Sequence, residues 1–155
     1  MTGHGSDKKI RSMKEQRRKI GIVGGAGFIG YSLAWYLSES FEIEILDVKC
    51  PSCDLKDNIT YRHCDVRDSE SLHSGLSDVD LVFHTAIIQI PRINEDKRLA
   101  YEVNVLGTQN VCEAVRNLPK PTGMILASSW HTIGERELSG VVNEEFGFRP
   151  DKVED

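Results

Sequence analysis

Short apolar runs in this chain alternate with stretches in which apolar residues recur every three or four positions. Ile20 to Val23 is an apolar run that leads into glycines, and apolar residues then return at helical spacing from Phe28 to Leu37. Four further runs have the apolar, β-branched or alternating character of strands, at 42–46, 58–64, 80–84 and 123–129. The pattern therefore predicts five strands, the first of them followed at once by a helix.

Two more segments predict helices. "DSESLHSGL" begins with Asp68 or Ser69 as an N-cap and closes near Gly75. The longest helical pattern extends from Asp96 to Leu118, and its apolar face consists of Leu99, Val103, Leu106, Val111, Val115 and Leu118. Strands that alternate with helices require right-handed crossovers and a parallel sheet covered on both faces. The predicted fold class is α/β with a doubly wound parallel sheet.

Composition is that of a soluble globular protein with an uneven distribution of charge. The chain of 155 residues is 39% hydrophobic and 28% charged, with a net charge of -5, and has no apolar run long enough to span a bilayer. Residues 1–18 are basic, and we interpret them as a flexible leader rather than a nucleic-acid or membrane-binding patch. The leader lacks the apolar segment of a secretion signal, and the four cysteines are scattered, so we expect a cytoplasmic protein.

Three glycines follow the first predicted strand at intervals of three: Gly24, Gly27 and Gly30. In dinucleotide-binding loops the first glycine permits a tight turn, the second lets the backbone approach the pyrophosphate, and the third allows close packing of helix on strand. The helix that begins near Phe28 would offer unpaired N–H groups to the phosphates. The alternative is a glycine-rich turn without a ligand. No G-K-[ST] sequence follows, which disfavours a nucleotide triphosphatase loop.

Asp47 lies at the end of the second predicted strand, about 20 residues beyond the glycines. A carboxylate at this position accepts hydrogen bonds from the adenosine ribose and repels a 2′-phosphate. The sequence therefore favours NAD over NADP, although Lys49 is close by. A solvated turn carboxylate is the alternative interpretation of Asp47.

With four other segments, the glycine loop resembles the extended short-chain dehydrogenase/reductase family, in its NAD-dependent epimerase/dehydratase branch that includes the UDP-sugar epimerases. These segments are "GGAGFIG" at 24–30, "CDVRD" at 64–68, "DLVFHTA" at 80–86, "NVLGTQNVCEA" at 104–114 and "ILASSWHTIGE" at 125–135. The resemblance covers about Lys19 to Glu135. It implies a Rossmann domain over 19–155 that is incomplete at its C-terminal side, with the substrate domain absent.

The resemblance also implies roles for individual residues. Ser129 takes the position of the catalytic serine, which orients a substrate hydroxyl while a tyrosine, activated by a lysine, removes its proton and hydride passes to NAD. The cofactor-binding residues that it implies, besides Gly24, Gly27 and Asp47, are Phe28, Ile29, Gly30, Asp65, Val66, Thr85, Ala86 and Asn104. The expected substrate is a small molecule, with a nucleotide sugar as one possibility, and a homodimer is one possibility at full length. No nucleic acid or membrane partner is expected.

Several positions depart from the family pattern. They are Val23 where threonine is frequent, Thr85 in place of leucine, Ile87 in place of alanine and Ile133 in place of tyrosine. The bulk of Ile87 and Ile88 would narrow the nicotinamide side. The family's Tyr-x-x-x-Lys motif is missing, because none of the four tyrosines has a lysine four positions later. We therefore expect this chain alone to be inactive.

Cysteine and histidine residues suggest a competing metal site. Cys50, Cys53, His63 and Cys64 occur in an order that a zinc site or a redox pair can use. Adjacent residues on a strand point to opposite faces, however, so His63 and Cys64 are poorly placed to bind one metal ion. A plain surface turn is the favoured interpretation.

Three other polar residues have two interpretations each. His84 faces either the crevice or the core, with a buried, hydrogen-bonded histidine favoured. His131 is either a substrate contact or a solvated loop residue. Asn104 lies inside a predicted helix, where asparagine is unfavourable, which predicts a kink or a polar network near the site.

Two functions remain open at the level of sequence. The first is the NAD-binding part of an epimerase, dehydratase or reductase, and the second is a non-catalytic NAD-binding or regulatory module. Both require the same cofactor loop.

Overall fold

The structure is a computed structural model that describes residues 17–52, 54–120, 123–134, 136–149 and 151. Its contacts group the chain into two compact units, residues 1–125 and 126–155. Residues 1–16 of the basic leader expected at 1–18 lie outside the described residues. The expectation of one domain over 19–155 stays a prediction.

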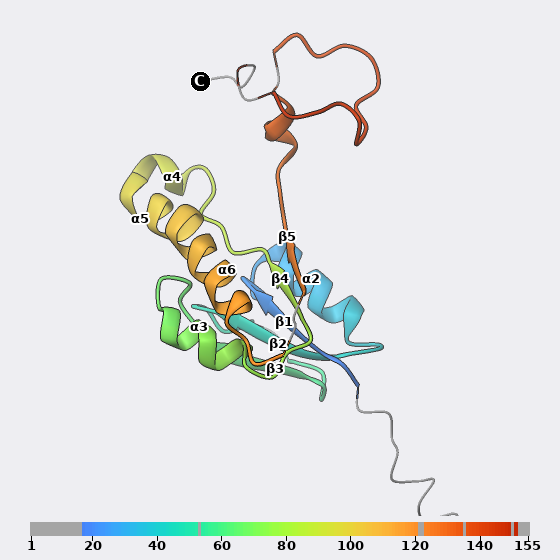
Figure 1. Ribbon diagram of the computed structural model, residues 1–155, viewed down its shortest axis with the longest axis vertical. Coiled ribbons are helices and arrows are strands. Elements are labelled where there is room, and N and C mark those ends of the chain that lie inside the picture. Colours follow the sequence, from blue (N-terminus) through green and yellow to red (C-terminus); the bar gives the residue numbers. More distant parts are fainter. Residues whose placement is uncertain (1–16, 53, 121–122, 135, 150, 152–155) are drawn as a thin grey trace, which may run out of the picture. The chain divides into compact units, whose positions relative to one another are not determined.

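Five strands form one sheet in the order β3-β2-β1-β4-β5 (Figure 1). They are β1 (Lys19–Val23), β2 (Glu42–Asp47), β3 (Ile59–His63), β4 (Leu81–His84) and β5 (Gly123–Leu126). The central strand β1 pairs in parallel with both β2 and β4. The chain order reverses across β1, which confirms the predicted doubly wound sheet and places its switch point between β1 and β4.

The strand register brings the functional segments to one edge. Val23 lies opposite Leu46 on one side and His84 on the other. On the next pair of strands, Asp47 lies opposite His63. The glycine loop, the end of β2 and the loop after β4 therefore leave the sheet at the same level.

Helices cover both faces of the sheet. Figure 1 shows α2 (Phe28–Leu37) on one side and α3 (Ser69–Leu76) with α6 (Thr108–Arg116) on the other. Ala34 of α2 packs with Ile22 and Ile45 in one core cluster. Leu72 and Val111 pack with strand residues in a second cluster on the opposite face. Burial of these apolar side chains on both faces supplies the main stabilisation of the parallel sheet.

The longest predicted helix is not one regular helix. It consists of α5 (Lys97–Tyr101), the π-helix η1 (Glu102–Gly107) and α6, and it follows a short helix, α4 (Arg92–Glu95), that the sequence pattern did not predict. The π turn inserts one residue into the helical period, which breaks the predicted apolar face. Leu106, expected on that face, is 41% exposed, whereas Gly107 is buried.

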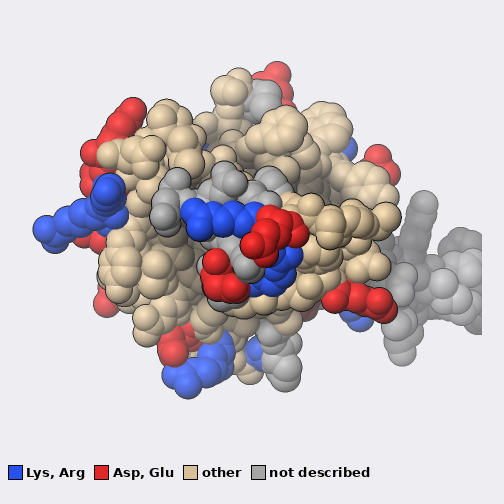
Figure 2. Space-filling view, turned by 90° about the horizontal axis from the view of Figure 1, so that it is seen from above, with Lys and Arg blue, Asp and Glu red and all other residues tan. Residues whose placement is uncertain are grey.

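Several charged side chains of the described residues form ion pairs with one another. Glu44 on β2 is only 3% exposed and accepts the Nε of Arg62 at 2.7 Å, with Lys19 as its second partner. Acidic and basic side chains are interspersed on the face shown in Figure 2. Within the described residues, the helices are too short or too polar to cross a membrane.

Candidate dinucleotide-binding site

A cavity of about 870 Å³ lies at the carboxyl ends of β1 to β4. All the predicted cofactor residues line it except Asn104; they are Gly24, Gly27, Phe28, Ile29, Gly30, Asp47, Asp65, Val66, Thr85 and Ala86. The volume and the position at the switch point are typical of a ligand site in an open α/β sheet. The structure therefore brings together residues that are spread over more than 60 positions of sequence.

The three glycines have different steric environments. Gly24 has a φ of +82°, and a Cβ there would lie 2.4 Å from the backbone nitrogen of Ala86. A Cβ on Gly30 would lie 2.4 Å from the carbonyl oxygen of Gly24. At Gly27 only that carbonyl is near, at 3.3 Å. Two glycines thus allow close backbone packing, and the middle one leaves space beside the cavity.

The N-terminus of α2 lies in the same wall. Gly27 is its N-cap, with no side-chain cap and no acidic residue in the first turn. The first N–H groups of a helix have no partner within the helix, and the helix dipole places partial positive charge there. Phe28 is 87% exposed. The turn can therefore bind an anionic group through backbone N–H groups.

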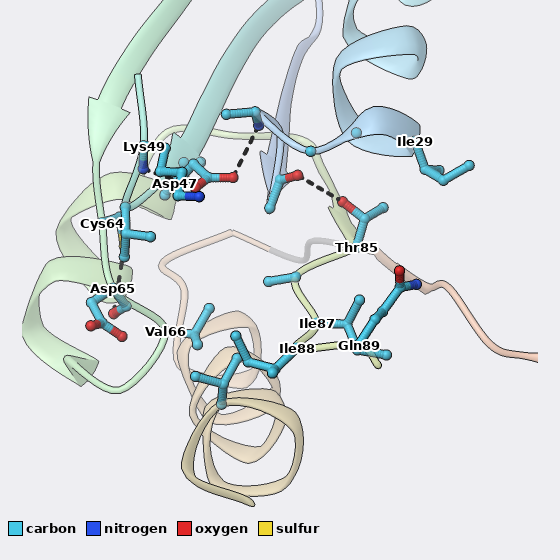
Figure 3. A pocket seen from close by; sticks show the side chains of 18 of the residues that line it. Ile29, Asp47, Lys49, Cys64, Asp65, Val66, Thr85, Ile87, Ile88 and Gln89 are labelled. Atoms are coloured by element: carbon cyan, nitrogen blue, oxygen red, sulfur yellow. Dashed lines mark hydrogen bonds between the residues drawn. The ribbon is translucent and has the colours of Figure 1, made fainter. Parts of the chain in front are cut away.

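Asp47 joins the end of β2 to the glycine loop. One carboxylate oxygen accepts the backbone N–H of Ala26 at 3.0 Å, and the other accepts that of Lys49 at 3.0 Å (Figure 3). Each oxygen keeps acceptor capacity beyond one hydrogen bond. Asp47 is thus held in one orientation beside the cavity and can still accept hydroxyl groups.

Asp65 lies farther along the cavity wall and is paired with Arg67. The guanidinium Nη2 is 2.6 Å from a carboxylate oxygen of Asp65, and Nη1 is 3.3 Å from Glu102. The hydrogen bonds from Arg67 hold the pKa of Asp65 below its ordinary value. Arg67 also lines the cavity. The motif "CDVRD" contains this arginine, but the sequence interpretation concentrated on the two residues before it.

Thr85 holds the glycine loop from the side of β4. Its hydroxyl lies 3.0 Å from the carbonyl oxygen of Val23 and 3.2 Å from that of Gly24, as Figure 3 shows for the latter. Its backbone N–H also donates to Val23 at 2.8 Å. The threonine that replaces the family's usual leucine thus ties the end of β1 to β4.

Asn104 supports the cavity without lining it. Its Oδ1 accepts the N–H of Ile88 at 2.8 Å, and its Nδ2 donates to the carbonyl oxygen of Ile88 at 3.0 Å. Asn104 lies in the π-helix η1, and Val103 beside it contributes to the lining. The polar network expected from a mid-helix asparagine is present, and the cofactor contact expected for this residue stays a prediction.

Residues 21–148 match the 3-beta hydroxysteroid dehydrogenase/isomerase family. The chain belongs to this family. The match covers the glycine loop, the strand ends that form the cavity and the loop of Ser129. It confirms the resemblance to NAD-dependent epimerases and dehydrogenases that the motifs indicated.

Individual relatives show the same likeness. The chain is 33% identical over 95 residues to short-chain dehydrogenase/reductase family 42E member 1 of Danio rerio, covering 60% of this chain and 24% of the relative. It is 29% identical over 119 residues to the decarboxylating sterol-4-alpha-carboxylate 3-dehydrogenase of Bos taurus, covering 76% and 32%. The chain thus spans about a quarter to a third of the length of these relatives.

A solved structure shows the same architecture. The UDP-glucose 4-epimerase of Thermus thermophilus, in complex with NAD, superposes with a TM-score of 0.72 at 26% identity. The superposition covers 86% of this chain and 45% of the epimerase. The Rossmann-like fold is therefore shared with members of this group of enzymes.

Ser129, the predicted catalytic serine, belongs to the second unit of the chain. It is the N-cap of the 3-10 helix η2 (Trp130–Ile133) and accepts the backbone N–H of His131 at 3.3 Å. The carbonyl oxygen of Ser129 also accepts the hydroxyl of Thr132 at 2.8 Å. These contacts hold the serine at the start of a tight turn, and its catalytic role stays a prediction.

Sequence reasoning left out part of the cavity wall. The lining residues that it did not include in the cofactor site are Ala26, Leu46, Val48, Lys49, His63, Cys64, Arg67, Gln89, Arg92, Leu99 and Val103. Ile87 and Ile88, which were expected to narrow the nicotinamide side, also line the cavity. Most of the omitted residues are neighbours in sequence of residues that it did include. For Leu46, Val48, Lys49, His63 and Cys64 the sequence held a signal, because each lies within two positions of the carboxyl end of a parallel strand.

Part of the proposed cysteine and histidine site can be located. Cys50 is exposed, Cys64 is buried, and Cys53 lies outside the described residues. Burial raises the pKa of the Cys64 thiol, which disfavours the thiolate that a metal ion would bind. Over the described ranges, no cluster of three or more His, Cys, Asp or Glu side chains has the arrangement of a metal site.

His84 predicts a pH dependence of stability. Burial lowers the pKa of its imidazole below the ordinary 6.5. Above that value the imidazole is neutral in both the folded and the unfolded state, but as pH falls below it the unfolded state takes up the proton first. The free energy of unfolding should therefore decrease, by up to about 1.4 kcal/mol at one pH unit below. Urea unfolding at pH 7.5 and 5.5 measures this, and His84→Gln should lack this contribution. An equal pH dependence in the variant would contradict the assignment.

Proposed function

We propose that this chain binds NAD and forms the cofactor-binding part of an epimerase or dehydrogenase that works by hydride transfer. The observation that carries the proposal is the different packing of the three glycines. Backbone atoms lie 2.4 Å from a Cβ built at Gly24 or at Gly30, whereas at Gly27, at the start of α2, only one backbone atom lies near, at 3.3 Å. A pyrophosphate needs such an opening beside unpaired N–H groups. The family match and the NAD complex of the superposed epimerase support the choice of ligand.

Each part of the cavity would hold a different part of NAD. The N–H groups at the start of α2 would bind the pyrophosphate, and Asp47 would accept the adenosine ribose hydroxyls. Asp65 and Val66 line the region beyond Asp47, which we assign to adenine. Thr85 and Ala86 lie on the side of β4, which we assign to the nicotinamide half. Bound NAD accepts or returns a hydride at its nicotinamide ring.

The residues of this chain would position groups rather than complete the proton transfer. Ser129 would orient a substrate hydroxyl, since a serine hydroxyl can donate and accept hydrogen bonds at once. The tyrosine and lysine that family members use have no counterpart in the four tyrosines of this sequence. We therefore propose that the acid–base step belongs to the full-length protein, with a small hydroxyl compound such as a nucleotide sugar as substrate. The reported relatives bear the names of dehydrogenases and epimerases, which favours an enzyme over a non-catalytic module.

Binding of NAD by the protein tests the proposal directly. Isothermal titration with NAD should give saturable binding at one site per chain. Titration with ATP should give weaker binding, because it lacks the nicotinamide half that would lie along Thr85 and Ala86. Absence of NAD binding by the folded protein would overturn the proposal.

Asp47→Ala should change the cofactor preference. Loss of a charged acceptor should weaken NAD about 10-fold or more, and loss of its negative charge should leave NADP binding unchanged or improved. Titration of the variant with both dinucleotides measures the ratio of the two dissociation constants. Asp57→Ala is a matched control, because it removes the same charge at an exposed position outside the cavity. An unchanged ratio in Asp47→Ala would remove this residue from the site.

A further inference from the structure

A series of side-chain hydrogen bonds connects the end of β4 to the π-helix. His84 Nε2 is 2.9 Å from the hydroxyl oxygen of Thr108. That hydroxyl lies 2.9 Å from the carbonyl oxygen of Asn104 and donates to it. His84 is 1% exposed, so its contacts are shielded from competing water.

The arrangement determines which nitrogen of His84 carries hydrogen. A threonine hydroxyl has one hydrogen, and that of Thr108 is directed to the carbonyl of Asn104. The bond between His84 and Thr108 therefore needs the hydrogen of Nε2. Nδ1 is then a bare acceptor, and it is buried with no hydrogen-bond partner among the described residues. The geometry thus requires a neutral imidazole in its Nε2–H form.

Thr108 adds a side-chain hydrogen bond where the π-helix passes into α6. Its backbone N–H donates to the carbonyl oxygen of Val105, three residues earlier. Its hydroxyl donates to the carbonyl oxygen of Asn104, four residues earlier. The side chain of Thr108 therefore ties α6 to the irregular turn, and His84 holds that side chain in position.

The π-helix also directs the side chain of Asn104 toward the cavity wall. Both polar groups of the Asn104 side-chain amide are bound to the backbone of Ile88, at 2.8 and 3.0 Å. Ile88 and its neighbours Ile87 and Gln89 line the cavity (Figure 3). A shift of the π turn would therefore move this wall.

We propose that His84 is a positioning residue that, through Thr108 and Asn104, fixes the wall formed by Ile87, Ile88 and Gln89. The effect on cofactor binding rests on the proposed NAD site. The coupling from His84 to Ile88 does not, because it is a property of the protein without cofactor.

The coupling can be measured by NMR in the absence of NAD. The nitrogen shifts of His84 should show hydrogen on Nε2 and a bare Nδ1 near neutral pH. The amide hydrogen of Ile88 should exchange slowly, and Thr108→Val should accelerate that exchange about 10-fold, as expected for loss of one buried hydrogen bond. Thr108→Ser keeps the hydroxyl and should exchange like the wild type. An Nδ1–H tautomer, or equal exchange in both variants, would overturn the proposal.

Cofactor affinity provides a second measurement with a matched pair of variants. The amide nitrogen of glutamine can donate from nearly the position of Nε2, so His84→Gln should keep NAD affinity close to that of the wild type. His84→Leu lacks a donor and should weaken NAD several-fold while accelerating exchange at Ile88. Equal losses in Gln and Leu would show a packing role and overturn the proposal. If the wild type itself bound no NAD, the proposed function would fail, whereas the exchange experiment would still test the coupling.

Discussion

Replacement of Gly27 by valine should abolish NAD binding while leaving the protein folded. A Cβ at this position has one near neighbour, the carbonyl oxygen of Gly24 at 3.3 Å, so a side chain requires a backbone shift of only a few tenths of an ångström, against contacts of 2.4 Å at Gly24 and Gly30. The valine methyl groups would occupy the space beside the N-terminus of α2 that the pyrophosphate needs. We expect at least about a 100-fold loss of affinity, equivalent to about 2.7 kcal/mol. Isothermal titration with NAD measures the loss, and circular dichroism with thermal melting confirms the fold.

Gly27→Ala is the graded control for this experiment. It adds one carbon atom in the same direction and should weaken NAD by less than valine does. Affinity in Gly27→Val within about threefold of the wild type, about 0.7 kcal/mol, would reject the glycine loop as the pyrophosphate site. If Gly27→Val lowered both the NAD affinity and the melting temperature, the substitution would have damaged the loop. The NAD affinity of Gly27→Ala would then decide whether the pyrophosphate binds at this position.

Replacement of Gly30 by alanine should destabilise the fold, whereas replacement of Gly27 should affect ligand binding. The added Cβ would lie 2.4 Å from the carbonyl oxygen of Gly24 and 2.7 Å from the Cα of Gly25, both of them backbone atoms. Neither can move without displacing the loop from β1, so α2 would have to shift. We expect the free energy of unfolding to fall by about 2–4 kcal/mol, although alanine is ordinarily the better helix former. Urea unfolding followed by circular dichroism measures this change.

Gly27→Ala again provides the comparison, because it makes the same chemical change three residues earlier. At an N-cap with extended backbone this change should cost less than about 1 kcal/mol. Equal stability of the two variants would show that α2 does not pack on the loop as closely as the structure describes. A stable Gly30→Ala protein that had lost NAD affinity would assign Gly30 to ligand contact rather than packing.

The two glycine experiments separate what the family fold requires from what the ligand requires. Gly24 and Gly30 make the close contacts by which β1, α2 and the loop after β4 meet. Gly27 makes almost none of them, and its small size has a reason only if something else occupies the space. This contrast is the strongest argument within the chain itself for a dinucleotide site.

Much of the fold could be predicted because its signals are local. The run from Ile20 to Val23 and the helical spacing after Phe28 were found as β1 and α2, and Asp68 caps α3 through the N–H groups of Glu70 and Ser71. The segment from Asp96 to Leu118 was predicted as one helix and contains a π turn. Apolar spacing alone does not reveal such a turn, because the bonds that stabilise it come from His84 and Ile88, which lie elsewhere in the sequence.

A residue of the site could be predicted from the sequence where its chemical role requires one residue type at a fixed distance along the chain from a motif. Asp47 is an example, since a carboxylate at the end of the second strand lies beside the glycine loop in any parallel sheet of this order. Arg67 is a counterexample, because its partner Glu102 lies 35 residues later and comes close only after the helix packs on the sheet. The same holds for Asn104, whose contact with Ile88 depends on the turn in which it lies.

By itself the sequence determined the order of the strands and of most helices, and the glycine loop with its acidic partner, because periodicity and motif spacing are properties of neighbouring residues. Its motifs also resembled the family to which the chain belongs. Only the tertiary structure decided which glycine is open, which oxygens of Asp47 are already bound, and how His84 reaches the cavity wall. Those features arise from contacts between segments that are distant in sequence. Backbone packing and shared hydrogen bonds, which leave no pattern in one segment, determine them.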